Sequence, residues 1–131
     1  MPSVPGFQLF DGMFNGLEGV LDLRRIQHTL TASNIANADT PEYCAKEMPF
    51  QELLSDVMKR AAGGEELDVN DLAEQTIREI PLPPGALDGN SVDAEKETLR
   101  LTSNSLLYNA VSNGMSRRLA LLRFAASDGK T

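Results

Sequence analysis

A long helical pattern at the C-terminal end of the chain restricts the folds open to it. The pattern covers residues 91–126, contains no proline, and has Asn90 or Ser91 as its expected N-cap. Glu95 near its start and Arg123 near its end suit the helix dipole. At 1.5 Å per residue such a helix is about 50 Å long, more than a domain of this size usually spans. It therefore needs a packing partner along most of its length.

A second helical pattern, at the N-terminal end, supplies that partner. It covers residues 8–38, with Asp11 as a candidate N-cap. The helix is expected to end near Asn37 or Ala38, because Pro41 disfavours the helical conformation in the residue before it. Three glycines weaken its first turns, since each costs about 1 kcal/mol relative to alanine: Gly12, Gly16 and Gly19.

The fold class follows from these two patterns. With no Trp and 5% aromatic residues, burial must come mainly from aliphatic side chains. We predict a mostly α fold in which the N- and C-terminal helices pair as a coiled-coil hairpin, with an irregular, partly extended middle segment. The predicted core stripe consists of Leu23, Ile26, Leu30, Leu99, Leu106, Val111, Met115 and Leu119.

Polar residues interrupt both stripes. Asn34 and Asn37 lie in the first, and Thr102, Asn109 and Asn113 lie in the second. A buried Asn lowers stability but can fix the register of paired helices, whereas an exposed one does neither. The sequence leaves both possibilities open for each of these residues.

The middle of the chain is heterogeneous. Phe50 to Met58 follow helical spacing and predict a helix of about three turns, ended by Ala61-Ala62-Gly63-Gly64. Residues 65–80 are acidic and could form a short strand or a loop. Prolines make residues 81–85 irregular, and Asp88-Gly89-Asn90 is a turn. The chain is thus one assembly domain of three segments, residues 8–41, 42–90 and 91–126.

Charge and composition exclude several classes of protein. The formal net charge of −7 argues against nucleic-acid binding. Residues 47–100 hold 13 acidic and 5 basic side chains, whereas residues 101–131 are net basic. This asymmetry could orient neighbouring copies, although a solvated acidic middle is the simpler interpretation. There is no apolar run of about 18 residues for a membrane span, and no cleavable secretory signal is expected at the N-terminus.

No catalytic or metal-binding constellation is apparent, so neither an enzyme nor a cofactor is expected. His28 and Cys44 are the only residues of their types, about 16 positions apart, and nucleophilic catalysis requires the two groups within hydrogen-bond reach. No pair of His or Cys residues has ligand spacing for a metal. Phosphate-binding glycine motifs are absent as well.

The most distinctive run is Ala32-Ser33-Asn34-Ile35-Ala36-Asn37-Ala38-Asp39-Thr40-Pro41-Glu42-Tyr43. Its small residues permit close approach of another backbone, and its prolyl turn reverses the chain. The run resembles the A-S-N-I-A-N-A-x-T-P-G-Y signature of bacterial flagellar rod, hook and hook-filament junction proteins. Two further runs, Asp88-Gly89-Asn90-Ser91-Val92-Asp93 and Asn104-Ser105-Leu106-Leu107-Tyr108, resemble segments of the small proximal rod subunits.

The resemblance implies a structural subunit of the flagellar basal-body proximal rod. Such subunits are exported by the flagellar type III apparatus without a cleaved signal, and their terminal helices form the inner wall of a periplasmic rod that transmits torque. Expected partners are further copies, other rod proteins, the inner-membrane ring and export-gate or adaptor proteins, with no cofactor or metal. The implied turn and intersubunit residues are Ser33, Asn34, Ile35, Ala36, Asn37, Thr40, Pro41, Tyr43, Asn104, Leu106 and Tyr108.

Glu42 departs from the signature, which has Gly at this position. If that Gly adopts a positive φ, Glu42 must strain or change the turn. Two alternative functions stay open, namely another small axial protein of the same family and a cytoplasmic helical adaptor or chaperone. The free chain is expected to be incompletely folded, and an N-terminal extension with Phe7, Leu9 and Phe10 is a candidate contact with the export gate or the ring.

Overall fold

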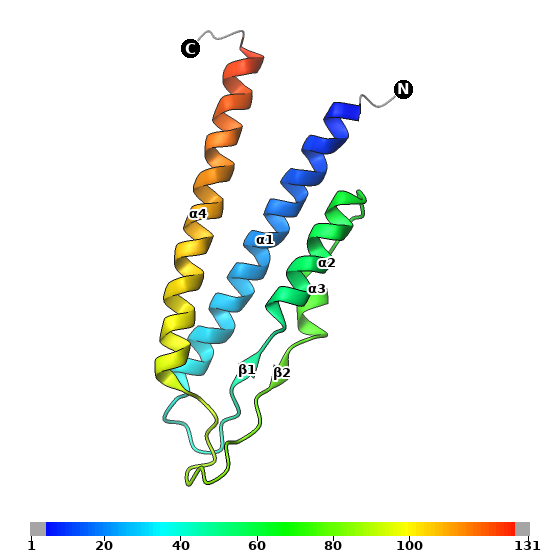
Figure 1. Cartoon of the computed structure of the whole chain (residues 1–131). Coiled ribbons are helices and arrows are strands. Elements are labelled where there is room, and N and C mark those ends of the chain that lie inside the picture. The colour runs from blue at the N-terminus through cyan, green and yellow to red at the C-terminus, as the bar shows by residue number, and fades with distance from the viewer. Residues whose placement is uncertain (1–4, 128–131) are drawn as a thin grey trace.

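The computed structural model describes residues 5–127, with side chains described from Phe10 to Ser127 (Figure 1). The elements are α1 (Pro5–Ala36), β1 (Lys46–Glu47), α2 (Phe50–Ala62), α3 (Val69–Glu74), β2 (Arg78–Glu79) and α4 (Ala94–Ala126). Helices α1 and α4 lie antiparallel, and α2 and α3 pack on the other side of α1 (Figure 1). The predicted fold class, with paired terminal helices around a short irregular middle, is confirmed.

The ends of the two long helices differ from the prediction. Asp11 lies inside α1, which begins at Pro5, so Asp11 is not the N-cap. Helix α4 begins at Ala94 with Asp93 as its N-cap, whose carboxylate accepts a hydrogen bond from the backbone N–H of Lys96 at 3.0 Å. The predicted caps Asn90 and Ser91 do not cap α4, because their side chains bond the backbone of the segment that follows α1.

The short helix predicted from Phe50 is present as α2, and it ends before Gly63 as expected. The prediction of only a strand or a loop for residues 65–80 is wrong in part. Asp68 accepts hydrogen bonds from the N–H groups of Asn70 and Asp71, and this N-cap starts the six-residue α3.

The extended part of the middle segment is a minimal sheet. β2 follows α3 and pairs antiparallel with β1, with Lys46 opposite Glu79 and Glu47 opposite Arg78. The Arg78 guanidinium also bonds the Glu47 carboxylate at 3.1 Å. In Figure 1 β2 lies beside β1, below α2 and α3, and leads the chain back towards the loop that precedes α4.

The core lies between α1, α2 and α3. Its buried members are Leu23, Met48, Leu53, Val57, Val69 and Ala73. Ile26 and Leu30 of α1 pack against this cluster. The apolar face of α1 is therefore taken by α2 and α3.

Helix α4 contributes almost nothing to this core. Its two buried residues are polar, Glu97 and Asn104. Leu99, Leu106 and Leu119 are 65%, 70% and 43% exposed, so their prediction as core residues is wrong for the single chain. Val111 and Met115 are half-buried. These apolar residues of α4 stay accessible because α2 and α3 cover the apolar face of α1, and α4 contacts α1 along a polar side.

Candidate assembly site

The signature run forms a compact corner at the end of α1. The Asn37 N–H donates to the carbonyl oxygens of Ser33 and Asn34, and the Thr40 N–H donates to that of Asn37 at 3.0 Å. The Tyr43 N–H donates to the Thr40 carbonyl at 3.4 Å. These bonds close two successive turns around Pro41, so the corner is held by its own backbone.

Asn90 ties this corner to the loop before α4. Its side-chain amide donates to the carbonyl oxygens of Asn37, Ala38 and Thr40 at 2.9, 2.9 and 2.7 Å. Its side-chain oxygen accepts the N–H of Val92 at 2.7 Å. The residue is buried, 8% exposed. The two N–H bonds of this one side chain are thus shared among three carbonyl groups of the Ala32–Tyr43 run.

Backbone contacts continue this junction on either side of Asn90. The Glu42 N–H donates to the Asp88 carbonyl at 3.0 Å, and the Ser91 N–H donates to the Tyr43 carbonyl at 3.1 Å. The Ser91 hydroxyl accepts the N–H of Ala45 at 2.7 Å. The two runs that carry the resemblance, almost 50 residues apart, therefore form one structural unit.

Asn34 organises the other side of the corner. Its amide group donates to the Lys46 carbonyl at 2.8 Å, and its oxygen accepts the Lys46 N–H at 2.9 Å. The same side chain donates to the Glu97 carboxylate at 3.1 Å and accepts from the Tyr43 hydroxyl at 3.3 Å. Glu97 is 3% exposed and also accepts a bond from Arg100 at 2.8 Å. Asn34 thereby connects α1, β1 and α4.

Asn104 makes the second polar contact between the long helices. Its amide donates to the Arg24 carbonyl at 2.7 Å, and its oxygen accepts from the Arg24 guanidinium at 3.3 Å. The partners run in opposite directions along the two helices, since Asn34 meets Glu97 and Arg24 meets Asn104. Buried polar pairs of this kind fix the register of antiparallel helices.

Glu42 is the one non-glycine residue with positive φ in the described part of the chain, at 59°. The backbone at position 42 is left-handed, as expected if the Gly of the signature adopts a positive φ, so Glu42 is strained in this turn. Gly89 lies directly against it, and a Cβ at Gly89 would stand 3.4 Å from the Glu42 Cα. Both positions favour glycine, and the chain carries it at only one of them.

The structure divides the predicted assembly residues into two groups. Asn34, Asn37, Tyr43 and Asn104 are buried or half-buried, and their side chains form hydrogen bonds within the chain. The others with largely accessible side chains are Ser33, Ala36, Thr40, Pro41, Leu106 and Tyr108, and Ile35 is half-buried. Intersubunit contact by these residues stays a prediction. Of the predicted N-terminal contact, Phe10 is 43% exposed, and Phe7 and Leu9 lie outside the described side chains.

Three residues for which the sequence predicted no contact with the corner or between the long helices are central to the site. Arg24, Glu97 and Ser91 each bond a residue far away in the sequence. A glutamate inside a helical pattern gives no signal of burial. Asn90, next to Ser91, was predicted as a turn residue and a candidate N-cap, but its role as a donor to the corner was not predicted.

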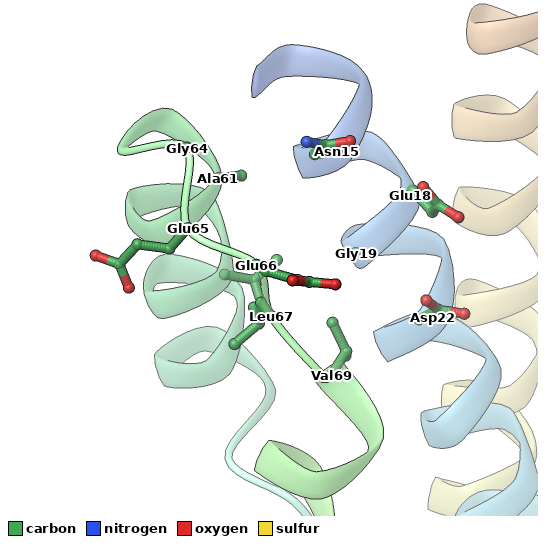
Figure 2. Close-up of a pocket in the computed structure, with 11 residues that line it drawn as sticks. Asn15, Glu18, Gly19, Asp22, Ala61, Gly64, Glu65, Glu66, Leu67 and Val69 are labelled. Atoms are coloured by element: carbon green, nitrogen blue, oxygen red, sulfur yellow. The ribbon is translucent and has the colours of Figure 1, made fainter. Parts of the chain in front are cut away.

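A groove beside α1 has no catalytic character. It measures about 430 Å³ and lies between α1 and the connection from α2 to α3, and Asn15, Glu18, Asp22, Glu65 and Glu66 line it (Figure 2). Its lining includes no nucleophile paired with a base. His28 is exposed on α1, and Cys44 is half-buried beyond the corner, with no hydrogen bond between them.

Two further properties of the described residues concern ligands and membranes. Nowhere between residues 5 and 127 do three His, Cys, Asp or Glu side chains gather in a way that could hold a metal ion. None of the helices there carries an apolar stretch of the length that a bilayer crossing requires.

Comparison with known proteins gives a consistent set of relatives. No protein-family model matches the chain. The flagellar basal body rod protein FlgB of Bacillus subtilis (strain 168) is 31% identical over 127 residues, which cover 93% of this chain and 98% of that protein. FlgB of Escherichia coli (strain K12) is 34% identical over 114 residues, 76% of this chain and 81% of its own length. FlgB of Salmonella typhimurium is 36% identical over 102 residues, 67% and 73% of the two chains.

Proposed function

The chain belongs to the family of the flagellar basal body rod protein FlgB, and on that premise we propose that it is a structural subunit of the proximal basal-body rod. In this role it leaves the cytoplasm through the flagellar type III apparatus and assembles with copies of itself and other rod proteins. The base of the rod contacts the inner-membrane ring and the export gate. The assembled rod transmits torque to the parts beyond it.

The observation that carries this proposal is the exposed apolar surface of α4. Leu106, Leu121 and Phe124 are 70%, 69% and 53% exposed, and α1 covers none of them fully. Figure 1 shows the axes of α1 and α4 diverging towards the chain termini. A surface this apolar is unusual in a protein that acts alone, and further helices of the assembly would cover it.

The corner built by the signature run presents exposed side chains to a neighbouring subunit. Asn90 and Asn34 hold it rigidly to α4 and β1, while Ser33, Thr40 and Pro41 remain exposed on its outside. A rigid corner presents these side chains in a constant geometry to a neighbouring subunit. Preorganisation of this kind lowers the entropy cost of each contact in the rod.

Electron cryotomography of motors in cells lacking this chain tests the role directly. We expect the inner-membrane ring to persist with no rod above it. A normal rod and hook in these cells would make the rod assignment wrong, and the cytoplasmic adaptor would become the leading hypothesis.

Cell fractionation tests the export step. The chain is expected in basal bodies of wild-type cells and only in the cytoplasm of cells whose flagellar export gate is deleted. An adaptor would stay in the cytoplasm in both strains, so the same measurement separates the two functions.

A further inference from the structure

A groove beside the polar contact between α1 and α4 combines an apolar floor with a cationic rim. It measures about 470 Å³ and lies between α1, the start of α2 and the first turns of α4. Phe50 and Leu99 supply apolar surface, and Arg24, Lys96 and Arg100 supply positive charge. The one carboxylate in its lining, Glu47, is bonded to Arg78 at 3.1 Å.

Arg24 is the unsatisfied charge of this groove. Its guanidinium stacks on the Phe50 ring, 4.3 Å from the centroid, and reaches the Asn104 oxygen at 3.3 Å. Its Nε is buried without a hydrogen-bond partner, and no carboxylate of residues 10–127 lies within ion-pair distance. Desolvation lowers the pKa of Arg24, because burial penalises its charged form.

Lys96 adds a second uncompensated cation. It is exposed on α4, and the described carboxylates form no ion pair with it. Arg100 is different, since it is bonded to Glu97 at 2.8 Å. A groove with two uncompensated cations is suited to an acidic segment.

The chain carries such a segment at another place on its own surface. The connection from α2 to α3 and the start of α3 expose Glu65, Glu66, Asp68 and Asp71, none of them in an ion pair with a described residue. Leu67 among them packs against the core of its own chain, so the segment presents mainly carboxylates. Figure 2 shows the Glu65 side chain directed away from α1.

In its own chain, this acidic connection lies far from the Lys96 end of the groove. Glu66 lines a hollow beside Gly19 of α1. Lys96 is next to Glu97, which bonds Asn34 near the end of α1. Gly19 and Asn34 are 15 residues apart on α1, a separation of about 22 Å along a helix. Groove and connection are therefore available to different molecules.

We propose that the groove formed by Arg24, Phe50, Lys96, Leu99 and Arg100 receives the acidic connection Glu65–Asp71 of an adjacent copy of this chain. The contact joins two different surfaces, so it is heterologous and propagates as an open helix rather than closing as a two-fold dimer. This inference rests on the proposed function, because it names the partner surface used within the rod.

Cysteine cross-linking in isolated basal bodies tests the geometry. The variants carry Lys96→Cys, Glu66→Cys or both, in a Cys44→Ser background that removes the one native thiol. With both substitutions, mild oxidation should give covalent oligomers. A disulfide requires Cα atoms within about 7 Å, and positions 66 and 96 of one chain are too far apart, so each disulfide must join two chains. Each single variant should stay monomeric on a non-reducing gel.

Four outcomes would overturn the inference. Covalent dimers of the Lys96→Cys single variant would mean that groove faces groove. Dimers of the Glu66→Cys single variant would mean that the acidic connections face each other. A double variant that is present in basal bodies but not cross-linked would reject the docking and leave the rod function intact. A chain absent from basal bodies would reject the rod function itself, and the docking with it.

Charge reversal supplies an independent test in the same cells. Lys96→Glu should lower the amount of chain in basal bodies by about fivefold or more, since it replaces attraction by repulsion. Adding Glu65→Lys and Glu66→Lys to the same chain should restore it. Lys59→Glu, at an exposed site of α2 outside the groove, is the matched control and should have no effect. An equal loss with Lys59→Glu, or no restoration, would contradict the docking.

Discussion

At the residue scale, one buried amide determines how the two recognised runs meet. Asn90 donates to three carbonyl oxygens of the corner and accepts a backbone N–H of its own loop. No other side chain type of this size offers two donors and an acceptor in that arrangement. The corner and the start of α4 therefore depend on a single residue for their relative position.

Asn90→Ala should lower the free energy of unfolding by about 2 kcal/mol, because it removes several hydrogen bonds from a buried site. Asn90→Asp should be at least as destabilising, since it keeps the acceptor for Val92 but turns a negative charge towards the carbonyl oxygens. Urea unfolding followed by circular dichroism measures both. Asn113→Ala, at an exposed position of α4, should change the value by less than about 0.5 kcal/mol. Full stability of Asn90→Asp would show that the donor role is unimportant.

Glu42 occupies a backbone conformation whose energetic cost can be measured. Its φ of 59° lies in the left-handed region, which costs a residue with a Cβ about 1–2 kcal/mol. Glu42→Gly should therefore be more stable than Glu42→Ala by about 1 kcal/mol in the same urea titration. Ala is the proper reference, because it removes the carboxylate and keeps the Cβ. Equal stability of the two variants would mean that the turn relaxes around position 42.

At the scale of elements, the long helices are joined by polar pairs rather than by an apolar seam. A double-mutant cycle on Asn34→Ala and Glu97→Ala should give a coupling energy of about 1–3 kcal/mol, because the bond is buried and one partner is charged. The cycle of Asn34→Ala with Glu95→Ala, an exposed residue of the same turn, should give almost none. Equal coupling in the two cycles would contradict a specific bond.

The contact between α1 and α2 depends on close approach. A Cβ at Gly19 would stand 2.5 Å from Cγ1 of Val57, which is 1% exposed. Gly19→Ala should therefore destabilise the chain by about 1–2 kcal/mol, even though alanine favours the helix. Gly114→Ala, with no atom within 4 Å of the added Cβ, should instead stabilise α4 by up to about 1 kcal/mol. Thermal melts that shift in the same direction for both would show that packing at Gly19 is loose.

At the scale of the whole molecule, the core and the exposed apolar surface lie on opposite sides of α1. The core binds α1 to α2 and α3, while much of α4 extends past the polar contacts without cover. This arrangement separates stability of the single chain from assembly. Substitutions on the exposed side of α4 should therefore affect assembly and leave the stability of the single chain unchanged.

Leu106→Gln and Leu121→Gln should leave the free energy of unfolding within about 0.5 kcal/mol of wild type, because both side chains are about 70% exposed and Gln favours helices. The same variants should reduce swimming in soft agar and the amount of chain in basal bodies. Leu23→Ala is the opposite case and should lose about 2–5 kcal/mol, since Leu23 is fully buried. Normal swimming with both glutamine variants would show that this surface is not used in assembly.

What the sequence by itself determined is local. Helical spacing predicted both terminal helices and α2, the prolyl turn predicted the end of α1, and the signature run predicted the family. Each depends on residues close together in the chain, where periodicity and turn chemistry act directly. Helix α3 was not predicted, because six residues are too few to show helical periodicity. Only its N-cap, Asp68, indicates it in the sequence.

Only the tertiary structure decided which faces meet. The apolar stripe of α1 could pack against α4 or against the middle segment, and the glycines of α1 favour α2 because they permit its close approach. Helix α4 is left with polar partners, so Glu97 and Asn104 are buried while Leu99 and Leu106 are exposed. Periodicity shows that a helix has an apolar face, but competition among elements far apart in the sequence decides what covers it. In this chain, that competition leaves much of the apolar surface of α4 exposed.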